Sequence, residues 1–306
     1  MKTVSVVICA YSEKRWDNLV KAIESIQEQT LPAQEVIVVI DHNPSLFDQT
    51  KNSFPRIIVI ENKYAAGSSG ARNCGAERAS GEILAFIDDD AVASSDWLNN
   101  LVSGYQDLSV MGIGGRIIPV WGKPRPRWFP DEFDWVVGCT YRGIPEIRMS
   151  VRNLILCNMS MRRENFQTIG GFRTNIGHRG GTPHGDEETE LCIRAHQQWP
   201  QLKFIYEPTA VVFHHVPASR TTINYFFWRC FLEGNSKAML SELVGANDGL
   251  SSEWKYTTQT LPAGVVRGIW DAISHLDPDG LARSGFIVTG LVATVWGYLR
   301  RKLFVK

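Results

Sequence analysis

The chain has 306 residues, with 32 basic and 32 acidic side chains, so its formal net charge at pH 7 is zero. This balance argues against a protein whose main task is to coat nucleic acid, which usually needs an excess of positive charge. Hydrophobic residues make up 44% of the sequence, enough for a sizeable core. The length suits one large α/β domain, which we place at residues 1–230, followed by a helical region at residues 231–306.

The six cysteines are scattered, and none forms a Cys-x-x-Cys pair. A zinc site made of cysteines and a disulfide framework are therefore both disfavoured. The first residues have no signal-peptide layout and lead directly into an apolar strand pattern. We therefore expect a cytoplasmic chain with reduced thiols.

Strand and helix patterns alternate along the first ninety residues. Helical spacing of apolar residues predicts a helix that starts near Trp16 and stops at Leu31-Pro32. A flexible loop, Gly67–Gly70, is expected to lead into a second helix at residues 71–79. Short β-branched runs predict buried strands at residues 4–9, 35–40, 56–60 and 82–87. Such alternation is typical of a doubly wound, mostly parallel sheet, whose ligands bind beyond the carboxyl ends of the strands.

The pattern is less regular in the second half of the chain. Two further helices are predicted at residues 186–197 and 222–243. Residues 121–130 are rich in proline and aromatic side chains. We expect this segment to be a surface connection or, alternatively, to line an acceptor site.

Two common nucleotide-binding motifs are absent from the sequence. Neither G-x-x-x-x-G-K-[ST] nor G-x-G-x-x-G follows the first strand, where the sequence is Cys9-Ala10-Tyr11-Ser12-Glu13. A P-loop protein and a Rossmann dehydrogenase are therefore disfavoured.

Carboxylates follow two of the predicted strands. Asp41 ends the second strand, and Asp88–Asp90 ends the fourth. Adjacent parallel strands would bring these side chains to one edge of the sheet. Three consecutive carboxylates repel one another unless a cation or solvent relieves them, and a hard divalent cation that also binds substrate phosphates is the natural occupant. For a lone Asp, a role in a turn would be the better explanation.

Two later segments could add to such a site. The segment Asp186–Arg194 holds four acids in five residues, more than a helix start needs, and one of them could act as a general base. The pair His214-His215 follows an apolar run. Successive side chains of a strand point to opposite faces, so only one of the two can easily reach a metal site.

Taken in order, these motifs resemble family 2 glycosyltransferases of the GT-A fold over roughly residues 1–235. The resemblance implies transfer of a sugar from a nucleotide diphosphate, expected to be UDP, to an acceptor hydroxyl by a single inverting displacement. The motifs that carry it are Val6–Tyr11, Asp41, Gly67–Gly75, Ile87–Asp90, Gly170-Gly171-Phe172, Glu187–Arg194 and His214.

The resemblance also implies roles for single residues. Asp41 would contact the base, Arg72 would steady the nucleotide, and Asp90 would bind Mn²⁺ or Mg²⁺ together with His214. Glu188 stands where the family has its catalytic Asp, with Glu187 beside it, and the sequence leaves open which of the two is the base. The residues expected to bind the nucleotide sugar are Ala10, Tyr11, Glu13, Asp41, Arg72, Asp88 and Asp89, and those expected to contact the acceptor are Trp128, Asn158 and Arg194.

The C-terminal region contains an uncharged stretch, residues 285–299, followed by Arg300-Arg301-Lys302. Fifteen residues are fewer than the ~20 that a spanning helix needs. The stretch is expected either to pack in a core or to lie in the membrane interface, and we favour peripheral contact with the inner face of the cell membrane. A glycan, glycolipid or small molecule is the expected acceptor, and a homo-oligomer is left open.

Two rival functions remain from the residues alone. A sugar nucleotidyltransferase would also use an α/β sheet and an acidic metal site, but it should carry a Gly-rich basic loop after the first strand, and none is present. A non-catalytic sugar-nucleotide-binding scaffold would be expected to have lost part of the set Asp88, Asp90, Glu188 and Arg194.

Overall fold

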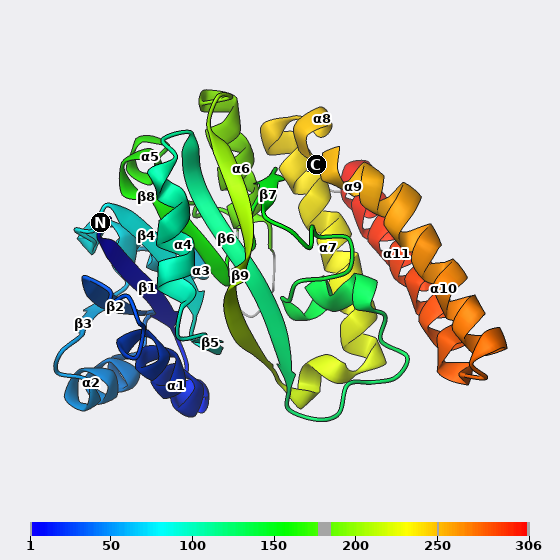
Figure 1. Cartoon of the computed structure of the whole chain (residues 1–306), viewed down its shortest axis with the longest axis horizontal. Helices are drawn as coiled ribbons and strands as arrows, with labels where there is room; N and C mark the ends of the chain where they lie inside the picture. Colours follow the sequence, from blue (N-terminus) through cyan, green and yellow to red (C-terminus); the bar gives the residue numbers. More distant parts are fainter. Residues whose placement is uncertain (1, 177–184, 250, 305–306) are drawn as a thin grey trace. The chain divides into compact units, whose positions relative to one another are not determined.

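The computed structural model of the chain describes residues 2–176, 185–249 and 251–304. These residues form two compact units (Figure 1). Unit 1 comprises Met1–Ile118 and Pro145–His214, and unit 2 comprises Pro119–Ile144 and His215–Lys306. The predicted boundary at residue 230 falls inside helix α7 (Ile223–Val244), and the segment 119–144 groups with the C-terminal helices.

Unit 1 is built on a mixed sheet with the strand order β3-β2-β1-β4-β8-β6-β9-β5, to which β7 is added through β9. The first four strands in this order are parallel, whereas β8 pairs antiparallel with both β4 and β6, and β9 pairs antiparallel with β5 and β7. The strands are β1 (Val4–Ala10), β2 (Glu35–Ile40), β3 (Ile58–Glu61), β4 (Ile83–Asp88), β5 (Ala91–Ala93), β6 (Val110–Trp121), β7 (Met149–Val151), β8 (Asn158–Arg162) and β9 (Lys203–Val216). The predicted α/β class and the mostly parallel sheet are confirmed. β8 is reversed between β4 and β6, so β6 runs in the same direction as β1, β2, β3 and β4. The backbone bonds from Lys203 to Ser109 and from Gly122 to Val216 show that β9 runs in this direction as well.

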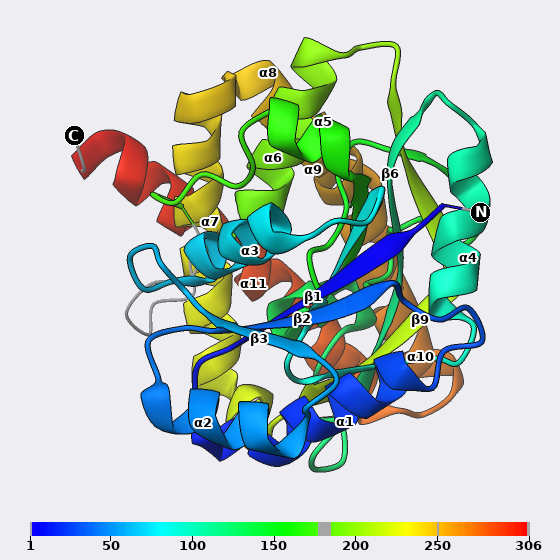
Figure 2. The ribbon, with the colours of Figure 1, turned by 90° about the vertical axis from the view of Figure 1, so that its left-hand side faces the viewer.

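Helices cover both faces of the parallel strands. Figure 2 shows α1 and α2 on one face and α3 on the other. The helices of unit 1 are α1 (Trp16–Gln27), α2 (Pro44–Ser53), α3 (Ser68–Arg78), α4 (Trp97–Ser103), α5 (Arg163–Thr168) and α6 (Glu187–Gln198). Helix α2 was not predicted, although Asn43 caps it by accepting a hydrogen bond from the backbone N–H of Leu46 and Pro44 occupies its first turn.

Helix α3 begins earlier than predicted and lies very close to the sheet. The expected loop Gly67–Gly70 is for the most part its first turn, with Gly67 as the N-cap at φ 144°. A Cβ at Gly75 would lie only 2.5 Å from Val7 Cγ1 and 3.0 Å from Val39 Cγ2, so any larger residue would push the helix away. This close approach fixes the distance between the helix and the strand ends beside it.

Unit 2 is a helical assembly in which α11 packs against both α7 and α10. Its helices are α7 (Ile223–Val244), α8 (Ala246–Gly249), α9 (Ser251–Lys255), α10 (Leu261–Ser274) and α11 (Pro278–Phe304). A Cβ at Gly234 would lie 1.8 Å from the carbonyl oxygen of Thr294, and one at Gly297 would lie 2.0 Å from that of Phe231. Glycines therefore let the α7 and α11 backbones touch, as small residues do between closely packed helices.

Aromatic rings fasten the segment 121–130 within unit 2. The Trp128 ring stacks on Phe286 of α11 with centroids 4.3 Å apart, and Phe226 in α7 makes T-shaped contacts with both Trp128 and Phe129. The predicted surface connection is thus anchored by its own aromatic side chains.

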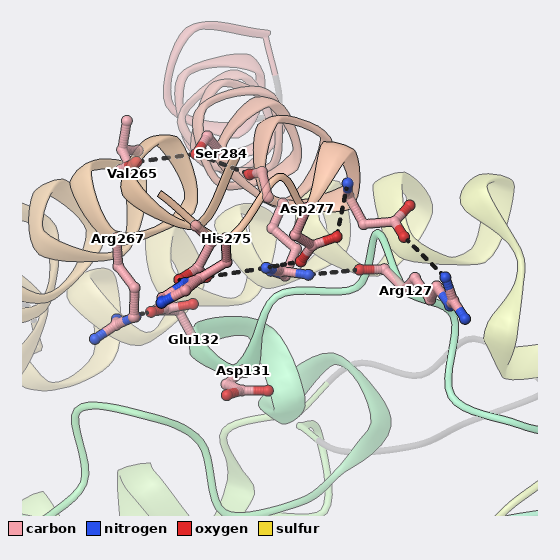
Figure 3. Close-up of polar contacts among 12 residues, drawn as sticks. Arg127, Asp131, Glu132, Val265, Arg267, His275, Asp277 and Ser284 are labelled. Atoms are coloured by element: carbon pink, nitrogen blue, oxygen red, sulfur yellow. Dashed lines mark hydrogen bonds and ion pairs between the residues drawn. The ribbon is translucent and has the colours of Figure 1, made fainter. Parts of the chain in front are cut away.

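Ion pairs surround a cavity of about 510 Å³ in unit 2 (Figure 3). Arg267 contacts Glu132, and Arg283 donates to both Asp271 and Asp277. Deeper in, Arg125 holds Asp134 through two hydrogen bonds of 2.8 and 3.1 Å. Burial raises the pKa of Asp134 to about 6 despite the opposing effect of Arg125.

The raised pKa of Asp134 predicts a pH-dependent stability. Because the folded state favours the protonated carboxyl, this contribution is complete below pH ~4 and is lost as the pH rises through ~6. The free energy of unfolding of the wild type, relative to that of Asp134→Asn, should fall by up to about 3 kcal/mol between pH 4 and 7. Urea denaturation of both proteins across this range is the measurement, and parallel pH profiles would contradict the expectation.

Candidate functional site

The carboxyl ends of β1, β2 and β4 lie together, as expected for adjacent parallel strands. The register pairs Cys9 with Asp88 and Ala10 with Ile40, so Tyr11, Asp41 and Asp89 emerge at the same edge. Tyr11 is exposed, and the Arg15 guanidinium lies over its ring at 5.2 Å from the centroid. The residues predicted to bind the nucleotide sugar are therefore neighbours in unit 1.

Asp41 holds the start of α3. Its carboxylate accepts hydrogen bonds from the Asn62 amide at 2.6 Å and from the backbone N–H of Gly67 at 2.9 Å. Nearby, the Asn43 amide donates to Glu13 at 2.9 Å and to the carbonyl of Tyr11 at 3.1 Å. This hydrogen bond from Asn43 lowers the pKa of the exposed Glu13 carboxyl.

Arg72 is the buried cation of the site. Its guanidinium donates to Asp88 at 2.7 Å and lies 3.5 Å from Glu187. Burial alone would lower the pKa of Arg72, but the facing carboxylates raise it above its usual value. The side chain comes from the first half of α3, one turn before Gly75, so the close packing of that helix places it.

Arg15 is a second cation of the site, and it was not among the predicted site residues. It contacts Asp89 at 2.7 Å and Asp90 at 3.1 Å. Burial raises the pKa of Asp89 to about 7, although the charge of Arg15 opposes this shift. No motif marks Arg15, since it follows the first strand in a short 3₁₀ turn and reaches the acids only through the fold.

His214, and not His215, turns toward the acids. The pairing of β5 with β9 sets Ala91 beside His214, and the His214 ring nitrogen Nε2 lies 3.2 Å from an oxygen of the Asp90 carboxylate. One ligand atom each from Asp88, Cys157 and His214 lies within 4.8 Å of the others.

Buried oxygens and an imidazole at this edge fit a divalent cation such as Mn²⁺ or Mg²⁺. Oδ2 of Asp89 is buried and has no hydrogen-bond partner within the described part of the chain. The donor set is therefore chemically suited to the predicted cation.

Glu187 and Glu188 begin α6 in different surroundings. Glu187 is buried, accepts a hydrogen bond from Ser68 at 3.0 Å and faces Arg72. Burial raises its pKa, and its second oxygen has no hydrogen-bond partner among the described residues. Glu188, the next residue, is half-buried.

The predicted acceptor residues have structural contacts. Asn158 is fully buried, accepts from the Trp97 indole and donates to the carbonyls of Arg116 and Ala210. Arg194 donates to Glu190 and to the carbonyls of Ile169 and Gly171. Trp128 belongs to the aromatic cluster of unit 2. These contacts use the polar atoms of Asn158 and Arg194 within the protein, and the acceptor role of all three residues stays a prediction.

Comparison with known proteins identifies the family. Residues 5–170 match the family model described as glycosyl transferase family 2. The chain belongs to this family. A glucosyl-dolichyl phosphate glucuronosyltransferase of Haloferax volcanii is 36% identical over 244 residues, which cover 78% of each protein.

Two solved structures show the GT-A fold. The mannosyltransferase PcManGT from Pyrobaculum calidifontis, solved with GDP-Man and Mn²⁺, has a TM-score of 0.59 at 16% identity, over 96% of this chain and 87% of that one. GalNAc-T7, solved with UDP, GalNAc and Mn²⁺, has a TM-score of 0.57 at 17% identity, over 90% of this chain and 58% of that one. The chain is thus a glycosyltransferase of GT-A fold that moves a sugar from a nucleotide-sugar donor to an acceptor.

Asp90→Asn should weaken the divalent-dependent binding of nucleotide by at least ~10-fold, because the substitution removes a charged oxygen from the predicted cation site. Calorimetry of UDP binding with Mn²⁺, repeated with EDTA, measures the effect. The control is Glu164→Gln, an exposed carboxylate just after β8 and hence at the opposite edge of the sheet. An affinity equal to that of the wild type would refute the assignment of Asp90.

Proposed function

We propose that the enzyme is a metal-dependent hexosyltransferase that takes its sugar from UDP and inverts the anomeric centre. The observation that carries the proposal is the convergence of Asp88–Asp90, Arg72, Glu187 and His214 at the carboxyl edge of β1 and β4. A nucleotide diphosphate brings negative charge to an edge that already holds carboxylates, so cations must balance both.

The donor side of the reaction would use Asp41, Arg72 and Asp88. Asp41, at the end of β2, would accept hydrogen bonds from the base. Arg72 and Asp88 would orient the ribose and sugar between them. Asp88, Asp90 and His214 would hold Mn²⁺ or Mg²⁺, which when bound offsets the charge that develops on the departing diphosphate.

The acceptor side would use a carboxylate at the start of α6. We assign the base to Glu188, with Glu187 as its positioning neighbour. As the acceptor oxygen bonds to the anomeric carbon, its proton passes to the carboxylate, and the bond from that carbon to the diphosphate oxygen breaks. Positioned base catalysis of this kind contributes typically ~10²–10⁴-fold to the rate.

Glu188→Gln should therefore lower kcat by about 10²-fold or more and leave donor binding nearly unchanged, because the base acts on the acceptor. Glu187→Gln is the matched comparison, since Glu187 contacts Arg72 and Ser68 and its loss should also disturb donor affinity. Steady-state transfer assays with calorimetry of UDP separate the two effects. If Glu187→Gln alone abolishes transfer, the base is Glu187.

We also propose that unit 2 docks the enzyme on the surface of the cell membrane, where a lipid-linked acceptor would be available. By length and composition α11 could cross a membrane, and only 28% of its most apolar window is buried. The relative from Haloferax is named for a dolichyl phosphate substrate, which supports a lipid as the partner of this surface.

The hairpin of α10 and α11 exposes one apolar stripe on each helix. Figure 1 shows the two helices side by side. The spacing of the exposed residues follows helical periodicity, so each stripe is one face of its helix. The stripes comprise Val266, Ile269, Trp270 and Ile273 on α10, and Leu281, Val288, Val292, Val295, Trp296, Leu299, Leu303 and Phe304 on α11. With Arg300-Arg301-Lys302 at one end, this composition suits an anionic interface.

Replacing Trp270 and Trp296 by Ser should reduce partitioning onto anionic liposomes at least ~10-fold, because both rings are more than half exposed and would enter the interface. Point substitutions are preferable to truncation before α11, since its removal would uncover α7. The control is Leu108→Ser, on an 80% exposed residue of unit 1. Co-sedimentation decides, and equal binding by all three proteins, or binding by none, would defeat the proposal.

A further inference from the structure

Cys157 lies beside Asp88 because β8 pairs antiparallel with β4. The register of β4 and β8 pairs Ile87 with Asn158, and its continuation by one residue sets Asp88 opposite Cys157. Residues directly opposite in such a ladder have Cβ atoms about 4.5–5.5 Å apart. The thiol is buried and belongs to unit 1, as do the acids.

The third member of the group comes from another strand. Ligand atoms of Asp88, Cys157 and His214 all lie within 4.8 Å of one another. Donors bound about 2.0–2.3 Å from one ion stand at most about 4.6 Å apart, so a single cation needs only small side-chain shifts to reach all three. The side chains arrive from β4, from the residue before β8 and from β9, and local sequence does not bring them together.

We propose that Cys157 is a protein ligand of the divalent cation, alongside carboxylate and His214. This inference rests on the proposed metal dependence and adds a soft donor to it. On binding, the thiol loses its proton to solvent and the sulfur bonds to the ion. A thiolate favours Mn²⁺, Co²⁺ and Zn²⁺ over Mg²⁺, because softer metals accept sulfur more readily.

Cobalt gives a readout that does not depend on activity. Co²⁺ added with UDP to the whole chain should produce visible ligand-field absorption, which reports the bound ion, and a near-ultraviolet band from thiolate-to-cobalt charge transfer. Cys157→Ser should lose the charge-transfer band and keep the ligand-field absorption. Cys9→Ser is the matched control, because Cys9 flanks Asp88 from the other neighbouring strand and lies outside the three-residue group. It should keep both bands.

Metal preference gives a second measurement. The ratio of the Mg²⁺ to the Mn²⁺ dissociation constant, measured with UDP, should fall about 10-fold or more in Cys157→Ser, since the hydroxyl is a hard donor. Circular dichroism checks that the variant folds, and Cys157→Ala replaces it if it does not.

Several results would overturn the inference. Bound Co²⁺ without a charge-transfer band in the wild type would do so without any variant, and so would a band that survives in Cys157→Ser. Sugar transfer by the same preparations is measured in parallel. Normal transfer with bound cobalt but no sulfur band would therefore remove Cys157 from the site and leave the proposed function standing.

Discussion

The site depends on keeping several carboxylates ionised and close together where water is largely excluded. A buried charge without a partner is very costly, and removal of one member of a buried pair leaves the other uncompensated. Arg72 faces Asp88 and Glu187, while Arg15 faces Asp89 and Asp90. Even with these partners, burial raises the pKa of Asp89 and Glu187. The remaining excess of negative charge is what makes the edge receptive to a cation.

The mixed sheet gives this edge its chemistry. The parallel strands β2 and β4 lead into acids, Asp41 and Asp88–Asp90, as strands of a nucleotide-binding sheet can. β8 begins at the same edge because it pairs antiparallel with β4, and the residue before it, Cys157, lies next to Asp88. β9 ends at this edge and places His214 next to Asp90. The close seat of α3, which only a glycine at position 75 permits, then brings Arg72 to the acids. The site therefore requires β4, β8 and β9, and it requires α3 at a fixed distance from the sheet.

Sequence patterns predicted the helices and strands that depend on the local succession of residues along the chain. The strand at 35–40 and the helices at 186–197 and 222–243 agree with β2, α6 and α7 to within one residue at each end. The short helix α2 was missed because its apolar spacing is weak, although Asn43 and Pro44 mark its start. No sequence motif marks Arg15 or Cys157. Cys157 reaches the acids through the register of β8 with β4, and Arg15 reaches them from the turn that follows β1. Asn158 and Arg194 were expected at an acceptor, but their polar atoms are used to join strands and turns.

The two faces of α11 explain why an uncharged stretch could not be interpreted from composition alone. One face carries Gly290 and Gly297, which let Phe133 and the backbone at Phe231 approach, so it requires a protein partner. The other face exposes Val292 and Trp296. A helix in a protein core would be covered on both faces. A membrane-spanning helix would not need such close backbone contact with α7. A helix with one face fitted to protein and one left apolar is suited to the boundary between a folded unit and a lipid surface.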